Sequence, residues 1–186
     1  MKDVELLADL VAFLAISVRK EVAELSREEL TWQPDAERNS IGITVWHFSR
    51  WLDVLTVQIL EGRPAEREQW FTRGWAHKTS YDPRGIGYLG FGVLTDYTPS
   101  EVAAIPFLDA ENLLTYLDQA CEALRHHLLS LPEGTLYQQA PGLQNSRSRY
   151  QVIRSILTGC FGHLGEIEAL KSMQKRAKEG IAEHRS

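Results

Sequence analysis

Cysteine is scarce in this chain of 186 residues. Its two cysteines, Cys121 and Cys160, are far apart in the sequence and form no CxxC motif. In a reducing compartment such cysteines remain free thiols. We therefore expect two free thiols in a protein of the cytoplasm.

The sequence also lacks a long apolar run and an excess of positive charge. No stretch of about 18 apolar residues occurs, so we expect no membrane span. Acidic residues interrupt the N-terminal "MKDVELLADL", which therefore differs from a signal peptide. The net charge is -5 and the basic residues are scattered, so the sequence predicts neither a nucleic-acid partner nor a membrane partner.

The alternation of apolar and polar residues that marks β-strands is weak throughout the chain. Apolar residues instead recur at three- and four-residue steps, which predicts long helices near residues 2–25, 40–60, 109–130 and 148–178. Four such helices, with one long connection between the second and the third, are typical of a four-helix bundle. We expect one all-α domain over residues 1–186, with a frayed tail at 179–186.

Several short motifs predict helix starts. "SREE" at residues 26–29 fits a capping box, and "TPSE" at 98–101 combines a cap with a proline at the first helical position. Asn39 or Ser40 is expected to cap the second long helix and Asp109 the third. Residues 62–107 are rich in glycine and aromatic residues, lack clear periodicity, and are expected to form a lid or a binding loop.

Two histidines lie on apolar helical stripes. His47 shares a face of its helix with Trp51, and His163 lies between Cys160 and Ile167 on the fourth long helix. Metal sites in bundle cores are built from side chains on facing helices. We predict that the two histidines meet inside the bundle, either as metal ligands or as hydrogen-bonded core residues.

Three glycines surround His163 in "GCFGHLGEIEAL", residues 159–170. Glycine inside a helix costs about 1 kcal/mol relative to alanine, so Gly159, Gly162 and Gly165 need an explanation. Bare backbone at these positions permits the close approach of a neighbouring helix or of bulky aromatic side chains. It also permits an open pocket beside Gly159.

The segments "WHFSRWLD" (46–53) and "HLGEIEALKSMQ" (163–174), with the lead-in "ELTWQPDAERNSIG" (29–42), resemble the DinB/YfiT-like superfamily. The resemblance covers nearly the whole chain. It implies a four-helix bundle, a homodimer and a divalent metal held by three histidines, one on the second long helix and two placed four residues apart on the fourth. Characterised members include S-transferases that use bacillithiol, mycothiol or glutathione, and a maleylpyruvate isomerase.

Carried over by position, the resemblance assigns His47 and His163 as metal ligands, whereas the third family ligand falls on Gly159, which has no side chain. Cys160, three residues before His163, is the nearest substitute, because a thiolate is a good zinc ligand. A small buried core residue is the other interpretation of Cys160. Glu166 is expected either as an oxygen ligand or as a hydrogen-bond partner of His163.

Two functions agree with this sequence. In the first, His47, His163 and Cys160 hold a divalent metal, zinc or nickel, in a transferase-type enzyme that acts on a small-molecule substrate and uses a low-molecular-weight thiol. In the second, the histidines are core hydrogen-bonding groups, and the protein is a non-catalytic binding or dimerisation module. The resemblance implies a homodimer in both cases.

Overall fold

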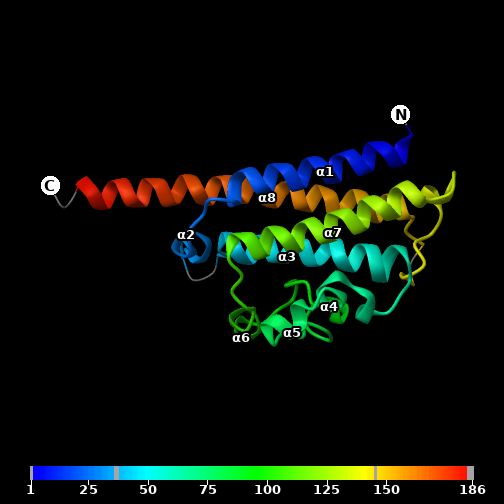
Figure 1. Ribbon diagram of the computed structural model, residues 1–186, viewed down its shortest axis with the longest axis horizontal. Coiled ribbons are helices and arrows are strands. Elements are labelled where there is room, and N and C mark those ends of the chain that lie inside the picture. Colours follow the sequence, from blue (N-terminus) through cyan, green and yellow to red (C-terminus); the bar gives the residue numbers. More distant parts are fainter. Residues whose placement is uncertain (1, 36–37, 145, 184–186) are drawn as a thin grey trace.

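The computed structural model describes residues 2–35, 38–144 and 146–183 as an all-α chain (Figure 1). Four long helices form a bundle: α1 (Asp3–Val22), α3 (Ile41–Val54), α7 (Ala110–Ser130) and α8 (Arg149–Glu183). Within the described residues, β structure is limited to an isolated bridge between Gln139 and Ser148. The all-α four-helix bundle expected from the sequence is confirmed.

Short helices fill the links between the long ones. α2 (Arg27–Thr31) lies between α1 and α3. The connection between α3 and α7, residues 61–109, contains α4 (Gln69–Thr72), α5 (Trp75–Thr79) and α6 (Pro99–Ala103). The caps predicted from the sequence form as expected: Ser26, Ser40, Thr98 and Asp109 each accept a hydrogen bond from a backbone amide of the first helical turn.

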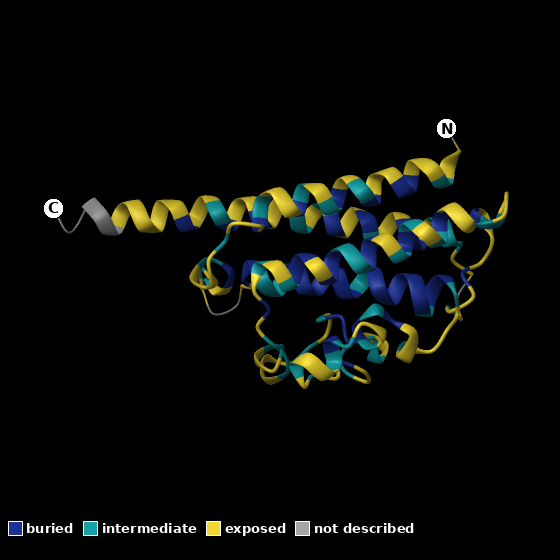
Figure 2. Cartoon of the chain, viewed as in Figure 1, coloured by how far each residue is buried: buried dark blue, intermediate teal, exposed yellow. Residues whose placement is uncertain are grey.

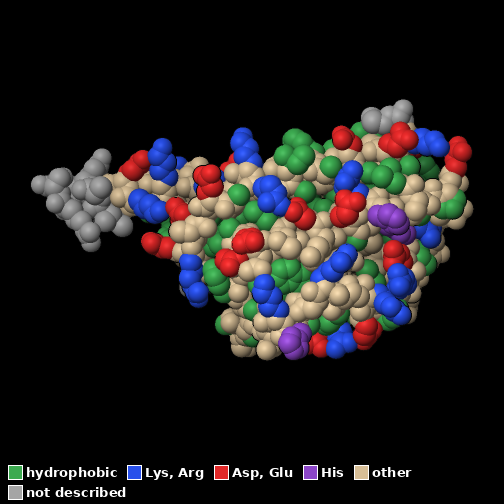
Figure 3. Space-filling model, viewed as in Figure 1, with side chains coloured by type: hydrophobic (Ala, Val, Ile, Leu, Met, Phe, Trp, Pro, Cys, Tyr) green, Lys and Arg blue, Asp and Glu red, His purple; other side chains and the backbone are tan. Residues whose placement is uncertain are grey.

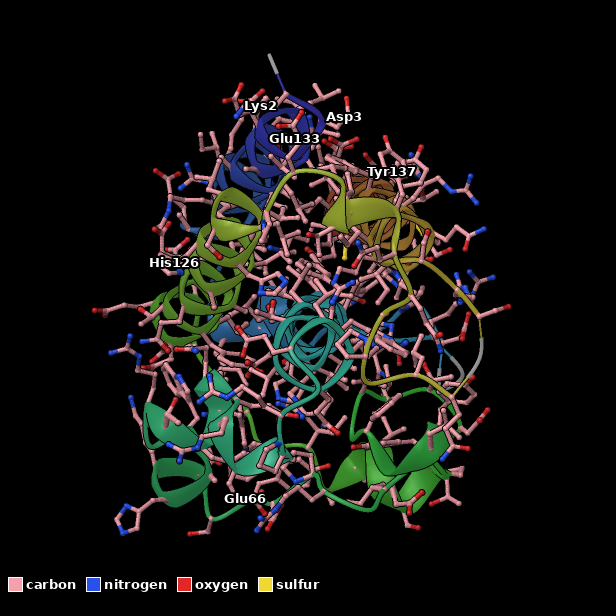
Figure 4. The ribbon with its side chains drawn as sticks, turned by 90° about the vertical axis from the view of Figure 1, so that its right-hand side faces the viewer. Lys2, Asp3, Glu66, His126, Glu133 and Tyr137 are labelled. Atoms are coloured by element: carbon pink, nitrogen blue, oxygen red, sulfur yellow. The ribbon has the colours of Figure 1, made fainter. Side chains whose placement is uncertain are left out.

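Helix α3 lies in the middle of the molecule. It packs against α7 and α8, which also pack against α1, and the connection covers its remaining side (Figures 1 and 4). Most of α3 is therefore buried (Figure 2). A helix surrounded in this way must be apolar on nearly every face, as "ITVWHFSRWLDV" is, and the polar groups in it need partners inside the protein.

The periodicity of the sequence predicts that the second long helix is a continuous α-helix to residue 60. In the structure, α3 ends at Val54 and a π-helical segment continues it. Residues Leu55–Leu60 form a π-helix, in which the amide of Glu61 reaches back to the carbonyl of Thr56 at 3.1 Å. The carbonyl of Ile59 accepts instead from the amide of Gly142, at 3.0 Å. A Cβ on Gly142 would lie 1.7 Å from the carbonyl oxygen of Gln58, so only glycine allows the α7–α8 loop to approach this closely.

Helix α8 is longer than expected and projects beyond the rest of the bundle (Figure 1). Lys171 donates to the carbonyl and the carboxylate of Glu21, each at 2.8 Å, and Gln174 donates to the carbonyl of Glu29 at 2.7 Å. These bonds attach α8 to the end of α1 and to α2. The helix continues to Glu183, and residues 184–186 of the expected tail lie outside the described residues.

None of the described helices combines the length and the apolar composition that a bilayer span requires. This agrees with the absence of a long apolar run in the sequence.

Candidate functional site

His47 of α3 and His163 of α8 face each other across the helix–helix contact. Their ring centroids are 4.9 Å apart, and the ring planes are inclined by 82°. His47 is only 9% exposed, whereas His163 is half-buried at the edge of the core. The meeting of the two histidines predicted from their apolar stripes is confirmed.

Each imidazole is held by its Nδ1 atom. Nδ1–H of His47 donates to the carbonyl oxygen of Val93 in the connection, and Nδ1–H of His163 donates to Oε2 of Glu166 at 2.7 Å. Because a carbonyl or a carboxylate can only accept, these bonds place the proton of each neutral ring on Nδ1 and leave a lone pair on Nε2. Nε2 of neither ring has a hydrogen-bond partner among the described residues.

The environment also keeps His47 uncharged. Burial lowers the pKa of His47 to about 4, and repulsion from a charged His163 lowers it further, against the smaller opposing effects of Val93 and Glu166. At neutral pH the His47 ring is therefore the neutral imidazole, which is the form that binds metal ions.

Cys160 lies on the other side of the same helical stripe. It is 2% exposed and close to Cys121 of α7, and burial raises the pKa of the Cys160 thiol to about 12. At about 100° per residue, positions three before and three after His163 are turned about 60° in opposite directions, so Glu166 flanks the histidine pair and Cys160 faces α7.

In the part of the chain that the structure describes, no three His, Cys, Asp or Glu residues form a group able to hold a metal. Cys160 as a ligand stays a prediction.

The glycines of α8 leave open space. A Cβ on Gly159, Gly162 or Gly165 would meet no atom of the described residues within 4 Å, apart from its own helix and chain neighbours. The close approach of another helix or of aromatic side chains within this chain is therefore wrong as an explanation. Gly159, one turn before His163, and the other two glycines are exposed, so the space beside them is solvent.

A cavity of about 290 Å³ lies beside Glu166, the hydrogen-bond partner of His163, although neither histidine lines it. Thr44, three residues before His47, lines it from α3, and Glu166 and Leu170 line it from α8. Asp35, Arg38 and Asn39 of the segment that leads into α3 supply polar side chains, whereas the remaining lining residues, Pro34, Ala169 and Met173, are apolar. A cavity of this size, at the lower end of the range for ligand pockets, can hold a small molecule against a mixed polar and apolar lining.

A second polar group, which the sequence periodicity did not predict, lies one turn further along α3. Arg50 is almost completely buried and pairs with Glu68 at 2.8 Å and with Asp53 at 3.5 Å. The hydroxyl of Tyr116 on α7 accepts from Arg50 at 3.2 Å and donates to Asp53 at 3.0 Å. We call these four residues the buried ionic cluster. Its signal in the sequence is the pair of charged residues inside the apolar run "WHFSRWLDVL".

In the buried ionic cluster, the charge of Arg50 offsets the cost of burying the carboxylates of Asp53 and Glu68. Burial raises the pKa of Glu68, and the neighbouring charge of Asp53 raises it further, while Arg50 opposes both effects. Asp53 also accepts from the backbone amides of Gln69 and Trp70, at 2.8 and 2.9 Å, which fixes the first turn of α4. The cluster thus attaches the connection to both α3 and α7.

Three successive carbonyls of the connection tie the cluster to the histidine pair. Arg50 donates to Phe91 at 3.2 Å and to Gly92 at 3.1 Å, and His47 donates to Val93. Gly92 has a φ of +65°, and a Cβ there would lie 2.3 Å from the carbonyl oxygen of Pro83. Glycine is required at this position, and Arg50 positions the segment that orients His47.

Comparisons with known proteins agree with this architecture. The sequence profile of the DinB superfamily matches residues 17–167, a range that contains both histidines. Among solved structures, the chain is similar to a conserved protein from Enterococcus faecalis, with a TM-score of 0.73 and 18% identity over 91% of this chain and 95% of that one. This likeness supports the fold alone, and no curated protein matches the chain. Because the family match covers well over half of the sequence, the chain belongs to the DinB superfamily.

Proposed function

We propose that this protein binds a divalent transition metal, zinc or nickel, between His47 and His163 and uses it in transferase-type chemistry on a small-molecule substrate. The placement of the two rings carries the proposal, because each Nδ1–H is engaged and each Nε2 keeps its lone pair. Metal-bound histidines commonly donate their other N–H to a carbonyl or a carboxylate, the two roles that Val93 and Glu166 fill here.

The two imidazole nitrogens are the type of ligand that zinc and nickel bind, but there are fewer of them than a catalytic site uses. Catalytic zinc sites use about three protein ligands and one open position, whereas this pair supplies two imidazole nitrogens. Cys160 is the candidate third ligand from the sequence, but its raised pKa disfavours the thiolate that a metal requires. When bound, the ion would supply Lewis acidity and lower the pKa of a thiol or a water that reaches its open side.

The cavity beside Glu166 supports a small polar substrate. Its volume of about 290 Å³ and the charged and polar side chains in its mixed lining suit a metabolite-sized molecule, and a low-molecular-weight thiol is the candidate second substrate. The free, buried thiols of Cys121 and Cys160 are consistent with a reducing compartment, and we keep the cytoplasm as the proposed location. The acidic net charge supports the absence of a nucleic-acid partner.

The alternative is a non-catalytic binding or dimerisation module of the same superfamily. It is favoured by the lack of a three-donor group among the described residues. In that case His47 and His163 are structural groups held by Val93 and Glu166, and the chain takes up no metal.

We also propose that the protein forms a homodimer through α1. Leu6, Leu10, Phe13 and Ile16 are 37–68% exposed and recur at helical spacing, which gives α1 a second apolar stripe besides the one in the core. Figure 3 shows hydrophobic side chains at the surface over this helix. A groove of about 360 Å³ between α1 and α8 adjoins the stripe. A continuous apolar patch on one helix can pair with the same patch of a second copy about a two-fold axis.

Metal analysis of protein purified without a histidine tag tests the proposed function. We expect near-stoichiometric zinc or nickel, or stoichiometric uptake on addition, with a metal-dependent rise in the melting temperature. His47→Asn and His163→Asn keep a donor near the Nδ1 position and remove Nε2, so both should abolish uptake. The matched control is His126→Ala, because His126 is exposed on the outer side of α7 (Figure 4). Wild-type protein that takes up no metal would overturn the proposal in favour of the non-catalytic module.

A further inference from the structure

The groove between α1 and α8 lies on a different face of α8 from the histidine pair. Its volume is about 360 Å³, and the two helices run side by side in the same direction along it (Figure 1). Phe161 lines the groove two residues before His163, which places the two side chains about 200° apart around the helix axis. The groove is therefore separate from the proposed metal site, and its role does not depend on metal binding.

The walls of the groove are mostly apolar. Leu6 and Leu10 line it from α1, and Leu157 and Phe161 line it from α8. Leu6 and Leu10 are 46% and 37% exposed, so part of this apolar surface is in contact with water. Removing apolar surface from water is favourable, and the groove therefore favours an apolar occupant.

Aromatic pairs bound the groove at both ends. Phe13 stacks on Phe161 with ring centroids 6.2 Å apart, and Tyr137 contacts Tyr150 with centroids 5.7 Å apart. Along the axis of α8, Tyr150 and Phe161 are about 16 Å apart. Spread over this length, the volume gives a mean cross-section of about 20 Å², far less than that of a helix about 10 Å in diameter. The groove suits a narrow, extended chain better than a second helix.

Arg154 gives the groove an unmet positive charge. Its guanidinium lies over the ring of Tyr150, 5.8 Å from the centroid. Among the described residues, Arg154 has no carboxylate partner. Asp3, the acidic residue of the lining, instead accepts from the hydroxyl of Tyr137 at 2.6 Å, at the end of the bundle that faces the viewer in Figure 4. A carboxylate on the occupant would complement the guanidinium.

We propose that this groove binds a free, single-chain amphipathic carboxylate, such as a fatty acid of medium length. Its carboxylate pairs with Arg154, and its hydrocarbon chain lies between α1 and α8 toward Phe161. A second copy of the chain is the competing occupant, because Leu6 and Leu10 also belong to the exposed apolar stripe of α1. The narrow cross-section and the unpaired guanidinium favour the carboxylate.

Isothermal titration calorimetry with decanoate, decan-1-ol and decyltrimethylammonium tests this inference. Wild type should bind one decanoate per chain, and should bind decan-1-ol about five- to tenfold more weakly and the cation more weakly still, because the guanidinium pairs only with the carboxylate. Arg154→Gln should remove the preference for decanoate and leave the affinity for decan-1-ol unchanged. The matched control is Arg176→Gln, at an exposed arginine near the C-terminal end of α8, and it should keep the preference.

Thr158→Trp blocks the groove from an exposed position of α8 and should abolish the binding of decanoate and decan-1-ol. Its melting temperature without amphiphile shows whether this variant is folded. Equal affinity of wild type and Arg154→Gln for decanoate, or binding that persists in folded Thr158→Trp, would overturn the inference. No binding of decanoate by wild type would also overturn it, and a dimer that Thr158→Trp converts to a monomer would then assign the groove to a second copy. Each of these results leaves the proposed metal binding untouched.

Discussion

Arg50 and Glu68 form an ion pair of 2.8 Å between side chains that are almost completely shielded from water. The guanidinium of Arg50 also holds the carbonyls of Phe91 and Gly92, next to the carbonyl of Val93 that orients His47. The long connection is thus not a loose lid. Its middle is fixed to α3 by buried charge, and the orientation of the histidine pair depends on that attachment.

Removing Arg50 should therefore destabilise the protein strongly. We expect Arg50→Met to lower the free energy of unfolding by about 3–5 kcal/mol, because Asp53 and Glu68 would be left buried without their cation. Arg19→Met is the matched control: Arg19 pairs with Asp118 at the surface, where such pairs contribute less than about 1 kcal/mol. Urea denaturation measures both. Similar losses in the two variants would show that the buried ionic cluster does not stabilise the fold.

The metal-free protein should lose stability in acid because of His47. Its pKa is about 4 in the folded protein against 6.5 for an unperturbed histidine, so the unfolded chain binds more protons between these values. The contribution of neutral His47 to the free energy of unfolding is therefore fully present above its pKa in the unfolded chain. It is lost as the pH falls to its pKa in the folded protein, by about 3 kcal/mol in all. In a chelating buffer, His47→Asn should lack this part of the decline. Parallel stability curves for wild type and variant from neutral pH to about pH 4 would contradict the assignment.

Two glycines of α8 should be replaceable. Gly162→Ala and Gly165→Ala should each raise the free energy of unfolding by about 1 kcal/mol, because alanine is the better helix former and the space is open. Gly134→Ala has equally open surroundings but a φ of +78°, so there the same change should be destabilising. If Gly162→Ala or Gly165→Ala weakens self-association instead, these glycines lie in the contact with a second copy of the chain.

The proposed dimer can be tested through the exposed stripe of α1. Wild type should sediment as a dimer at micromolar concentration, and the double variant Phe13→Ser/Ile16→Ser should sediment as a monomer, because the apolar contact is lost. Leu129→Ser, at a similarly exposed leucine near the end of α7, is the control and should leave the dimer intact. A wild type that is already monomeric would refute the proposal, and a dimeric double variant would place the interface elsewhere.

The periodicity of apolar residues sufficed to predict the four long helices, their caps and the meeting of His47 and His163. These features follow from local rules: a 3.6-residue repeat fixes which face is buried, and two inward histidines on neighbouring helices tend to meet. The sequence was less informative about Cys160. Spacing alone allowed it to point with His163, but the rotation of α8 turns it toward Cys121.

The partners of Arg50 depend on the tertiary structure. Glu68 and Tyr116 are 18 and 66 residues away in the sequence, and no local pattern pairs them with Arg50 or places Val93 over His47. The meaning of Gly159 was open for the same reason. A glycine in a helix can admit a neighbour or leave a space, and only the positions of all surrounding elements decide between them. The sequence by itself determined which surfaces are buried. The tertiary structure decided which polar groups share that interior, because their contacts form between segments whose separation along the chain carries no information about their distance in space.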